Sequence, residues 1–160
     1  GPQIEAIVRM LNESVKIAAD CGVTLAIENH IDYTSREILE ILQRVGSEAL
    51  KVNFDTGNTL RMMEDPVAAA RRLGPYTVAT HTKDVDACRH VRPEEWYFFS
   101  SVPVGTGLID IPGVARELKQ VGYTGVLAVE SDHHKDNQDE DKLVADSIAY
   151  LKRLVAEIDA

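Results

Sequence analysis

The stretch Leu50-Lys-Val-Asn-Phe-Asp-Thr-Gly-Asn58 sets the pattern from which the fold is predicted. Its apolar residues are typical of a short strand from Leu50 to Phe54, and a carboxylate, Asp55, follows at once. Three other apolar runs of strand length also end in a polar residue that can bind a metal ion. They end in Glu28 (after Val23-Thr-Leu-Ala-Ile27), in His81 (after Tyr76 to Thr80) and in Glu130 (after Gly125 to Val129). The sequence therefore predicts four strands of one kind, the first of them buried on both faces.

Helical patterns separate these strands. Apolar residues recur at helical spacing over residues 4–20, 34–46, 66–74, 112–121 and 143–158, and this spacing predicts that Val121 and Ile148 face the core. Thr34-Ser-Arg-Glu37 is a capping box, and Asp65 before Pro66 is typical of a helix start. Strands that alternate with helices form a parallel sheet with right-handed crossovers. Residues 85–104 remain as one long connection.

Composition narrows the class of protein further. The chain has 160 residues and a formal net charge of -9, with 44% hydrophobic and 27% charged residues, which fits a folded domain. No apolar run reaches the roughly 20 residues that span a bilayer, so we expect no membrane association. The acidic charge argues against a nucleic-acid surface. Cys21 and Cys88 form no disulfide framework, which indicates free thiols and a cytoplasmic location.

The polar residues at the four strand ends predict a metal site. In parallel α/β folds the ligand site lies at the carboxyl ends of the strands, so we expect Glu28, Asp55, His81 and Glu130 to converge. Three carboxylates and one imidazole favour Mn²⁺ or Mg²⁺, with Co²⁺ or Zn²⁺ as alternatives. Without a cation the carboxylates would repel one another, and at least one would take up a proton.

Several strings, in this order and spacing, resemble the xylose isomerase-like TIM-barrel superfamily of sugar (phosphate) isomerases and epimerases. They are Ala26-Ile-Glu-Asn-His30, Phe54-Asp-Thr-Gly-Asn58, His81-Thr-Lys-Asp84, Val104-Gly-Thr-Gly-Leu-Ile-Asp-Ile-Pro112 and Gly122-Tyr-Thr-Gly-Val-Leu-Ala-Val-Glu-Ser131. The resemblance implies a (β/α)8 barrel whose strands five to eight carry the metal ligands Glu28, Asp55, His81 and Glu130. It also implies that Glu28 and Glu130 are the catalytic acid/base pair.

This resemblance implies an isomerase or epimerase of sugars or polyols. The ion would polarise a substrate carbonyl, and a glutamate would remove the neighbouring proton to give an enediolate. The same chemistry serves a related lyase: a dehydratase, a 3-oxo acid decarboxylase or an enzyme that eliminates from 3-oxo-glycosides. An endonuclease-IV-like activity is disfavoured by Asn58 and by the acidic charge. A non-catalytic half-barrel that serves as an assembly module is the alternative outside enzymes.

Five further residues are candidates for contacts with the substrate or with the metal ligands. Many members of the superfamily have histidine three residues after the second-strand aspartate, where this chain has Asn58. Lys83 is either a positive charge for an anionic substrate or one half of a solvated ion pair with Asp84. Asp84 is also a candidate to orient His81. His30 and Arg89 are the other two candidates.

The length limits this prediction. A closed (β/α)8 barrel takes about 250 residues, whereas this chain provides four strands and five helices. We therefore expect residues 1–160 to form the carboxyl-terminal half of the barrel. Such a half exposes two sheet edges and one inner face, which predicts an oligomer or a missing amino-terminal half.

Overall fold

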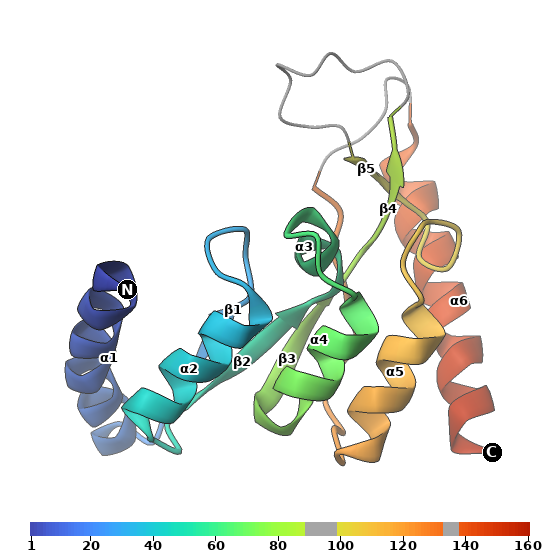
Figure 1. Cartoon of the computed structure of the whole chain (residues 1–160). Coiled ribbons are helices and arrows are strands. Elements are labelled where there is room, and N and C mark those ends of the chain that lie inside the picture. Colours follow the sequence, from blue (N-terminus) through green and yellow to red (C-terminus); the bar gives the residue numbers. More distant parts are fainter. Residues whose placement is uncertain (89–98, 133–137) are drawn as a thin grey trace.

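The structure is a computed structural model that describes residues 1–88, 99–132 and 138–160. Its centre is a four-stranded parallel sheet with the strand order β1-β2-β3-β6 (Figure 1). The strands are β1 (Leu25–Glu28), β2 (Leu50–Asp55), β3 (Thr77–Thr82) and β6 (Ala128–Val129). The four strands predicted from the sequence are therefore confirmed, and all of them run in one direction.

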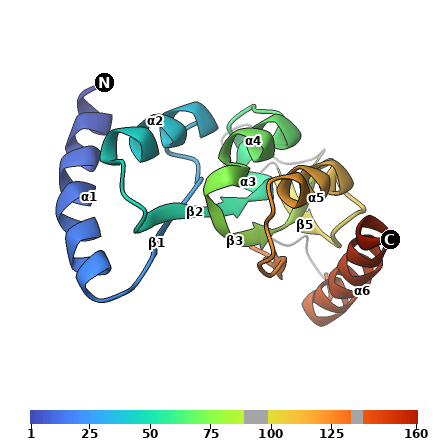
Figure 2. The same cartoon turned by 90° about the horizontal axis from the view of Figure 1, so that it is seen from below.

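Helices cover one face of this sheet and flank its two edges. They are α1 (Pro2–Asp20), α2 (Ser35–Val45), α3 (Thr56–Arg61), α4 (Pro66–Leu73), α5 (Ile111–Gln120) and α6 (Glu140–Asp159), with a 3-10 turn, η1, at Gly74–Tyr76. In Figure 2, α2, α4 and α5 lie along one side of the sheet, while α1 and α6 lie at opposite ends. None of the helices among the described residues combines the length and hydropathy that a bilayer crossing requires.

Local sequence explains where these helices begin and end. The Thr34 side chain accepts a hydrogen bond from the Glu37 amide, and the Glu37 carboxylate accepts one from the Thr34 amide, so the capping box is confirmed. Gly46 ends α2 with φ 61°, a left-handed conformation that favours glycine. Asp65 caps α4 through the Val67 amide.

The core lies between the sheet and the helices in front of it. Val52 and Phe54 of β2 are fully buried and pack against Ile38 of α2, Leu73 of α4 and Val114 of α5. Burial of an aliphatic or aromatic side chain of this size contributes about 1.5–3 kcal/mol to folding. A second cluster fixes α6 to the rest of the chain (Val85, Val104, Ile109, Ile111, Leu151 and Leu154).

The opposite face of the sheet is open. In Figure 2 no helix of the described residues lies directly below β1, β2 and β3, while α1 and α6 stand at the two ends of the sheet. Ala26 and Ala128, which share this face with Glu28 and Glu130, are exposed. The strands β1 and β6 each pair on one side only within the described sheet. The expected open inner face and unpaired edges are thus present.

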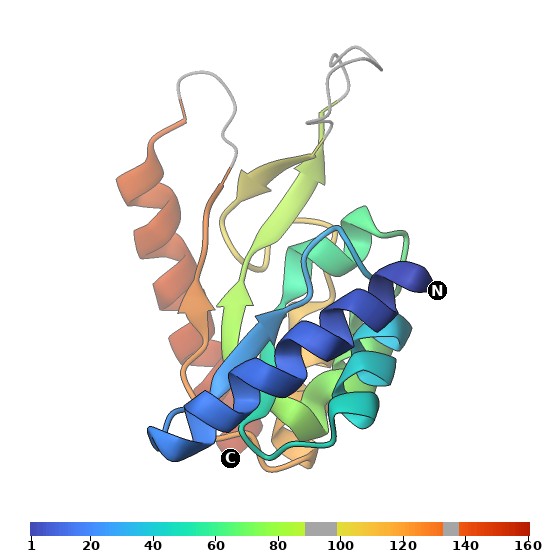
Figure 3. The same ribbon diagram turned by 90° about the vertical axis from the view of Figure 1, so that its left-hand side faces the viewer.

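Four details differ from the predictions. Ala26 is exposed, so β1 is not buried on both faces, because no helix of the described residues covers this face of the sheet. The connection 85–104 contains an antiparallel hairpin, β4 (Asp84–Ala87) with β5 (Phe99–Val102), which extends beyond the carboxyl ends of the sheet strands (Figure 3). The short helix α3 was not predicted. Val121 is 40% exposed, because α5 ends one residue before it, and Ile148 is 42% exposed, because it lies beside the buried stripe of α6.

Candidate metal centre

The four residues predicted as metal ligands lie together at the carboxyl ends of the sheet strands. Glu28 ends β1, Asp55 ends β2, His81 lies in β3, and Glu130 follows β6. One donor atom from each of them lies within 4.8 Å of the others. Asp55 is paired with His81 in the register of β2 and β3, so the sheet itself holds these two together. The expected convergence is confirmed.

His81 lies between the two glutamates. Its Nδ1 atom is 3.5 Å from Glu28 Oε1 and also 3.5 Å from Glu130 Oε2. Its other ring nitrogen, Nε2, is 3.1 Å from the side-chain amide nitrogen of Asn53 on the neighbouring strand. The imidazole therefore presents one nitrogen to the carboxylates and the other to an amide.

The two carboxylate oxygens of Asp55 have different neighbours: one caps helix α3, and the other faces the cluster. Oδ1 accepts hydrogen bonds from the amides of Gly57 (2.8 Å) and Asn58 (2.9 Å), which caps α3. The Asn29 side chain bonds both the amide and the carbonyl of Asp55, each at 2.8 Å, and fixes the backbone there. Oδ2 is thereby held toward the other three predicted ligands.

Three ligand atoms of the cluster are buried and make no hydrogen bond of good geometry, and two of them lie near the Lys83 ammonium group. They are His81 Nδ1, and Asp55 Oδ2 and Glu130 Oε2, which lie 3.1 Å and 2.8 Å from Lys83 Nζ. A buried polar atom left without a partner costs about 1–3 kcal/mol, so unpartnered atoms rarely gather in one place without a ligand. Carboxylate oxygens and an imidazole nitrogen are the ordinary ligands of divalent ions. These residues therefore fit a divalent cation.

Lys83 lies inside this cluster rather than in a solvated loop. Its side chain is 3% exposed, and Nζ lies 3.1 Å from Asp55 Oδ2, 2.8 Å from Glu130 Oε2 and 3.1 Å from Asp132 Oδ2. Burial lowers the pKa of Lys83, but the three carboxylates outweigh burial and raise it to about 12. The interpretation of Lys83 as half of a solvated pair is therefore wrong, because the ammonium group is an internal counter-charge.

The ionisation of Asp55 reflects the crowding of charge. Burial raises the pKa of Asp55 to about 8, and the neighbouring Glu130 carboxyl adds to this shift. Burial also opposes the ionisation of Glu130, but contacts with Lys83 and Asp55 outweigh it and lower its pKa. Burial thus favours the neutral form of Asp55, while Lys83 favours the ionised form of Glu130. The raised pKa of Asp55 has the direction expected of carboxyl groups crowded together without a cation.

Two contributors were missed by the sequence reasoning. Asp132 accepts from Lys83, from Ser101 Oγ (3.0 Å) and from Arg61 Nη1 (3.0 Å). Burial raises the pKa of Asp132, but Lys83 and Arg61 outweigh it and hold this pKa well below its usual range. The position of Asp132, two residues beyond Glu130 on the same strand end, was the signal that could have identified it. No pattern in the sequence indicated a role for Arg61, because it lies at the end of helix α3, which was not predicted.

When ionised, the carboxylates of this centre outnumber its side-chain cations by two. The residues in this count are Glu28, Asp55, Glu130 and Asp132 against Lys83 and Arg61. Two unit charges are what one divalent ion supplies. The charge balance therefore agrees with the convergence of the four ligand atoms.

The other predicted site residues have different places. Asn58 is fully buried, and its amide nitrogen donates to Glu28 Oε1 at 3.2 Å. Asp84 does not orient His81, because its carboxylate accepts from the amides of Val85, Gly105, Gly107 and Ile109 and fixes that loop. His30 is exposed beside Asp32 and is not in the cluster, because it lies in the loop beyond β1. Arg89 lies outside the described residues.

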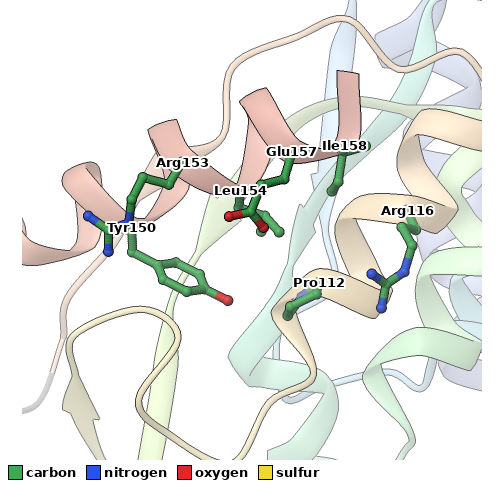
Figure 4. A pocket seen from close by; sticks show the side chains of 7 residues that line it. All are labelled: Pro112, Arg116, Tyr150, Arg153, Leu154, Glu157 and Ile158. Atoms are coloured by element: carbon green, nitrogen blue, oxygen red, sulfur yellow. The ribbon is translucent and has the colours of Figure 1, made fainter. Parts of the chain in front are cut away.

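A hollow of about 720 Å³ lies elsewhere, between α5 and α6. Figure 4 shows Pro112 and Arg116 of α5 on one side of it and five residues of α6 on the other. It contains none of the four converging residues, so the candidate metal centre does not depend on it.

The fold and the cluster define a class: a parallel β/α protein with a metal-type site at the carboxyl ends of its strands. The family model described as xylose isomerase-like TIM barrel matches residues 2–154, and the chain belongs to this family. The fold is accordingly that of a xylose isomerase-like TIM barrel, of which four strands are present.

Two curated relatives illustrate the match. The rhizopine catabolism protein MocC of Rhizobium meliloti is 31% identical over 142 residues, which cover 82% of this chain and 44% of MocC. The inosose dehydratase of Clostridium beijerinckii is 25% identical over 133 residues, which cover 76% of this chain and 45% of that enzyme. The chain thus spans somewhat less than half the length of these relatives.

Solved structures share the fold. A xylose isomerase domain protein from Planctomyces limnophilus has a TM-score of 0.79 at 24% identity, with 99% of this chain and 54% of that one covered. A family member from Mycobacterium smegmatis in complex with magnesium has a TM-score of 0.76 at 20% identity, with 100% and 53% covered. An L-ribulose 3-epimerase has a TM-score of 0.71 at 18% identity, with 95% and 54% covered.

Proposed function

We propose that Glu28, Asp55, His81 and Glu130 hold one divalent cation and form the catalytic centre of a sugar- or polyol-converting isomerase or epimerase. The observation that carries this proposal is the convergence of four ligand atoms within 4.8 Å of one another at the point where the four strand ends meet. The hard oxygen donors favour Mn²⁺ or Mg²⁺, and the imidazole also suits Co²⁺ or Zn²⁺. The magnesium in the related structure supports a cation in this family.

In this proposal the two glutamates move the proton. The cation supplies a positive charge that polarises a substrate carbonyl and makes the neighbouring C–H acidic. Glu28 and Glu130 lie on either side of His81 Nδ1, at 3.5 Å each, so two carboxylates are available to one substrate. Removal by one and return by the other inverts a carbon, which is epimerisation. Return to the neighbouring carbon is isomerisation.

Each of the two glutamate side chains is held in place by a neighbouring residue. The Asn58 amide holds Glu28 at 3.2 Å, and Lys83 holds Glu130 at 2.8 Å. A base that is held in one place loses less conformational freedom when it takes the proton. Asn58 is an amide and cannot transfer protons near neutrality, so acid/base work falls to the glutamates.

A lyase is the second candidate function. Inosose dehydratase is among the relatives, and dehydration begins with the same proton abstraction. The reactions differ in the next step, because a lyase expels a β-hydroxyl, a carboxyl or another leaving group. The product therefore separates them: an unsaturated or shortened ketone for a lyase, a stereoisomer or an aldose for the leading candidate.

We also propose that residues 1–160 are the carboxyl-terminal half of the barrel. The open inner face and the two unpaired edges of the described sheet support this placement. The substrate pocket would then be completed by an amino-terminal half or by another chain. A role in carbohydrate metabolism follows from the proposed chemistry, and the cytoplasmic location stays a prediction from the two thiols.

Deuterium exchange tests the proposed reaction. The chain, together with the half-barrel that completes it and with Mn²⁺ or Mg²⁺, is incubated with candidate ketoses and inososes in D₂O and followed by NMR. We expect metal-dependent incorporation of deuterium next to the carbonyl, reduced at least about 100-fold in Glu28→Gln and Glu130→Gln. Glu13→Gln, which changes an exposed glutamate of α1, is the matched control and should exchange at the wild-type rate. Wild-type exchange in both active-site variants would contradict the acid/base assignment.

A further inference from the structure

Asn53 contacts the ring nitrogen of His81 that is turned toward β2. The side-chain nitrogen of Asn53 lies 3.1 Å from His81 Nε2, while His81 Nδ1 lies among the carboxylates. A neutral imidazole has one nitrogen with a proton and one with a free lone pair. The group that contacts Nε2 therefore decides which nitrogen presents its lone pair to the cluster.

The amide orientation in the structure selects one tautomer. With the Asn53 NH₂ group against Nε2, the amide donates, Nε2 accepts, and the proton resides on Nδ1. That form has no lone pair for a cation at Nδ1. If the amide turns end for end, Oδ1 accepts from Nε2–H, and Nδ1 presents its lone pair to the cluster.

Nothing among the described residues opposes this turn. Asn53 Oδ1 is buried and has no hydrogen-bond partner, so the turn breaks one hydrogen bond and forms another. Asn29, one strand away, is different. Its amide nitrogen donates to the Asp55 carbonyl and its oxygen accepts from the Asp55 amide, so a turn would lose both bonds.

We propose that the Asn53 amide turns when the metal binds and so makes His81 a ligand through Nδ1. Asn53 is then a positioning residue that serves both states: it donates to Nε2 in the metal-free protein and accepts from Nε2–H in the loaded one. An aspartate at this position would only accept, and a leucine would do neither. This inference rests on the proposed metal site, because it requires a cation at His81.

Nitrogen NMR of the imidazole reads the tautomer directly. ¹⁵N-labelled chain is recorded at about pH 8 with and without Zn²⁺, and His81→Asn identifies the resonances of this ring. We expect the Nδ1–H form without metal and the Nε2–H form with Zn²⁺. Asn53→Asp should show the Nε2–H form in both states. Asn53→Leu should bind Zn²⁺ about tenfold more weakly, as loss of a partner behind a histidine ligand does.

One control variant and four possible outcomes make the test decisive. Lys51→Gln changes the net charge by the same amount as Asn53→Asp, on the same strand, and should leave the metal-free tautomer unchanged. An unchanged tautomer on Zn²⁺ binding, an imidazolium in the metal-free chain, or wild-type Zn²⁺ affinity in Asn53→Leu would each overturn the inference while the metal site stands. Absence of any Zn²⁺ effect on His81 would overturn the metal site, and this inference with it.

Discussion

At the scale of single residues, the raised pKa of Asp55 makes the stability of the fold depend on pH. Burial raises the pKa of Asp55 to about 8, well above the ordinary value of a carboxyl group. Between about pH 4 and pH 8 the folded chain therefore binds one more proton than the unfolded chain at this residue. By linkage, this residue makes the metal-free fold less stable as pH rises through that window.

Metal binding should reverse this dependence. A cation must displace the proton from Asp55, so its dissociation constant should fall about tenfold per pH unit from pH 6 toward pH 8 and then level off. Calorimetric titration with Mn²⁺ in buffers of different ionisation enthalpy measures both the affinity and the released proton. A pH-independent affinity with no proton released would show that Asp55 is not a ligand.

Removal of the Lys83 ammonium group should destabilise the fold. Lys83→Met leaves three carboxylates without their internal cation, and removal of one partner of a buried pair costs about 3–5 kcal/mol. Urea unfolding should show this loss in the metal-free chain and a smaller loss with saturating Mn²⁺, because the ion replaces part of the missing charge. Lys142→Met is the matched control, since its pair with Asp146 is exposed, and it should leave the free energy of unfolding nearly unchanged. An equal loss with and without Mn²⁺ would contradict the counter-charge role.

At the scale of elements, helix α3 packs at Gly57 against the side chain of Lys83, the residue that follows β3. A Cβ built on Gly57 would lie 2.6 Å from Lys83 Cγ and 2.9 Å from Cδ, so the lysine stem occupies the space of a side chain. Thr56 adds a second link, because its hydroxyl accepts from the Lys83 amide at 3.0 Å and donates to the Lys83 carbonyl. The helix thereby holds Lys83 where its ammonium group reaches Asp55 and Glu130.

Gly57→Ala tests this link. Alanine favours a helix over glycine by about 1 kcal/mol, so the substitution would stabilise a helix with free space beside it. We expect the opposite sign in urea unfolding, together with weaker Mn²⁺ binding, because the lysine stem must move. In the Lys83→Ala background the same substitution should be neutral or stabilising, which a double-mutant cycle measures. Additive effects of the two changes would refute the steric link.

The elements also show which features can be predicted from the sequence. The carboxyl ends of β2 and β6 (to within one residue) and the capping box of α2 depend on neighbouring residues, and they were predicted correctly, whereas β3 runs two residues beyond its predicted end, to Thr82. The hairpin β4–β5 depends on pairing across residues 89–98, and the exposure of β1 depends on which face of the sheet the described helices cover. Neither is visible in a local pattern.

The same distinction holds for the candidate site. The four residues predicted as ligands follow from their common position at strand ends, and the structure brings them together. The burial of Lys83 depends on the absent Cβ of Gly57, and the contact of Arg61 depends on the unpredicted helix α3. A charged side chain is ordinarily expected in solvent, so the sequence left open the solvated pair for Lys83, which the structure contradicts.

At the scale of the whole molecule, the open face of the sheet predicts association. Half a barrel leaves its inner face and two edges without partners, and such edges pair with other chains. Size exclusion with light scattering should therefore give a mass above the 17.7 kDa of one chain, from self-association of the chain alone or from a complex with a supplied amino-terminal half-barrel. A stable, well-folded monomer of the chain alone would contradict the half-barrel placement.

The central claim is that four side chains from four strands hold one divalent ion. The most direct measurement is an anomalous-scattering map of crystals grown with Mn²⁺. The account predicts a single strong peak bounded by Glu28, Asp55, His81 Nδ1 and Glu130, lost in a Glu130→Gln and Asp55→Asn double variant. No peak at this cluster, or a peak with only three of the four side chains around it, would contradict the account.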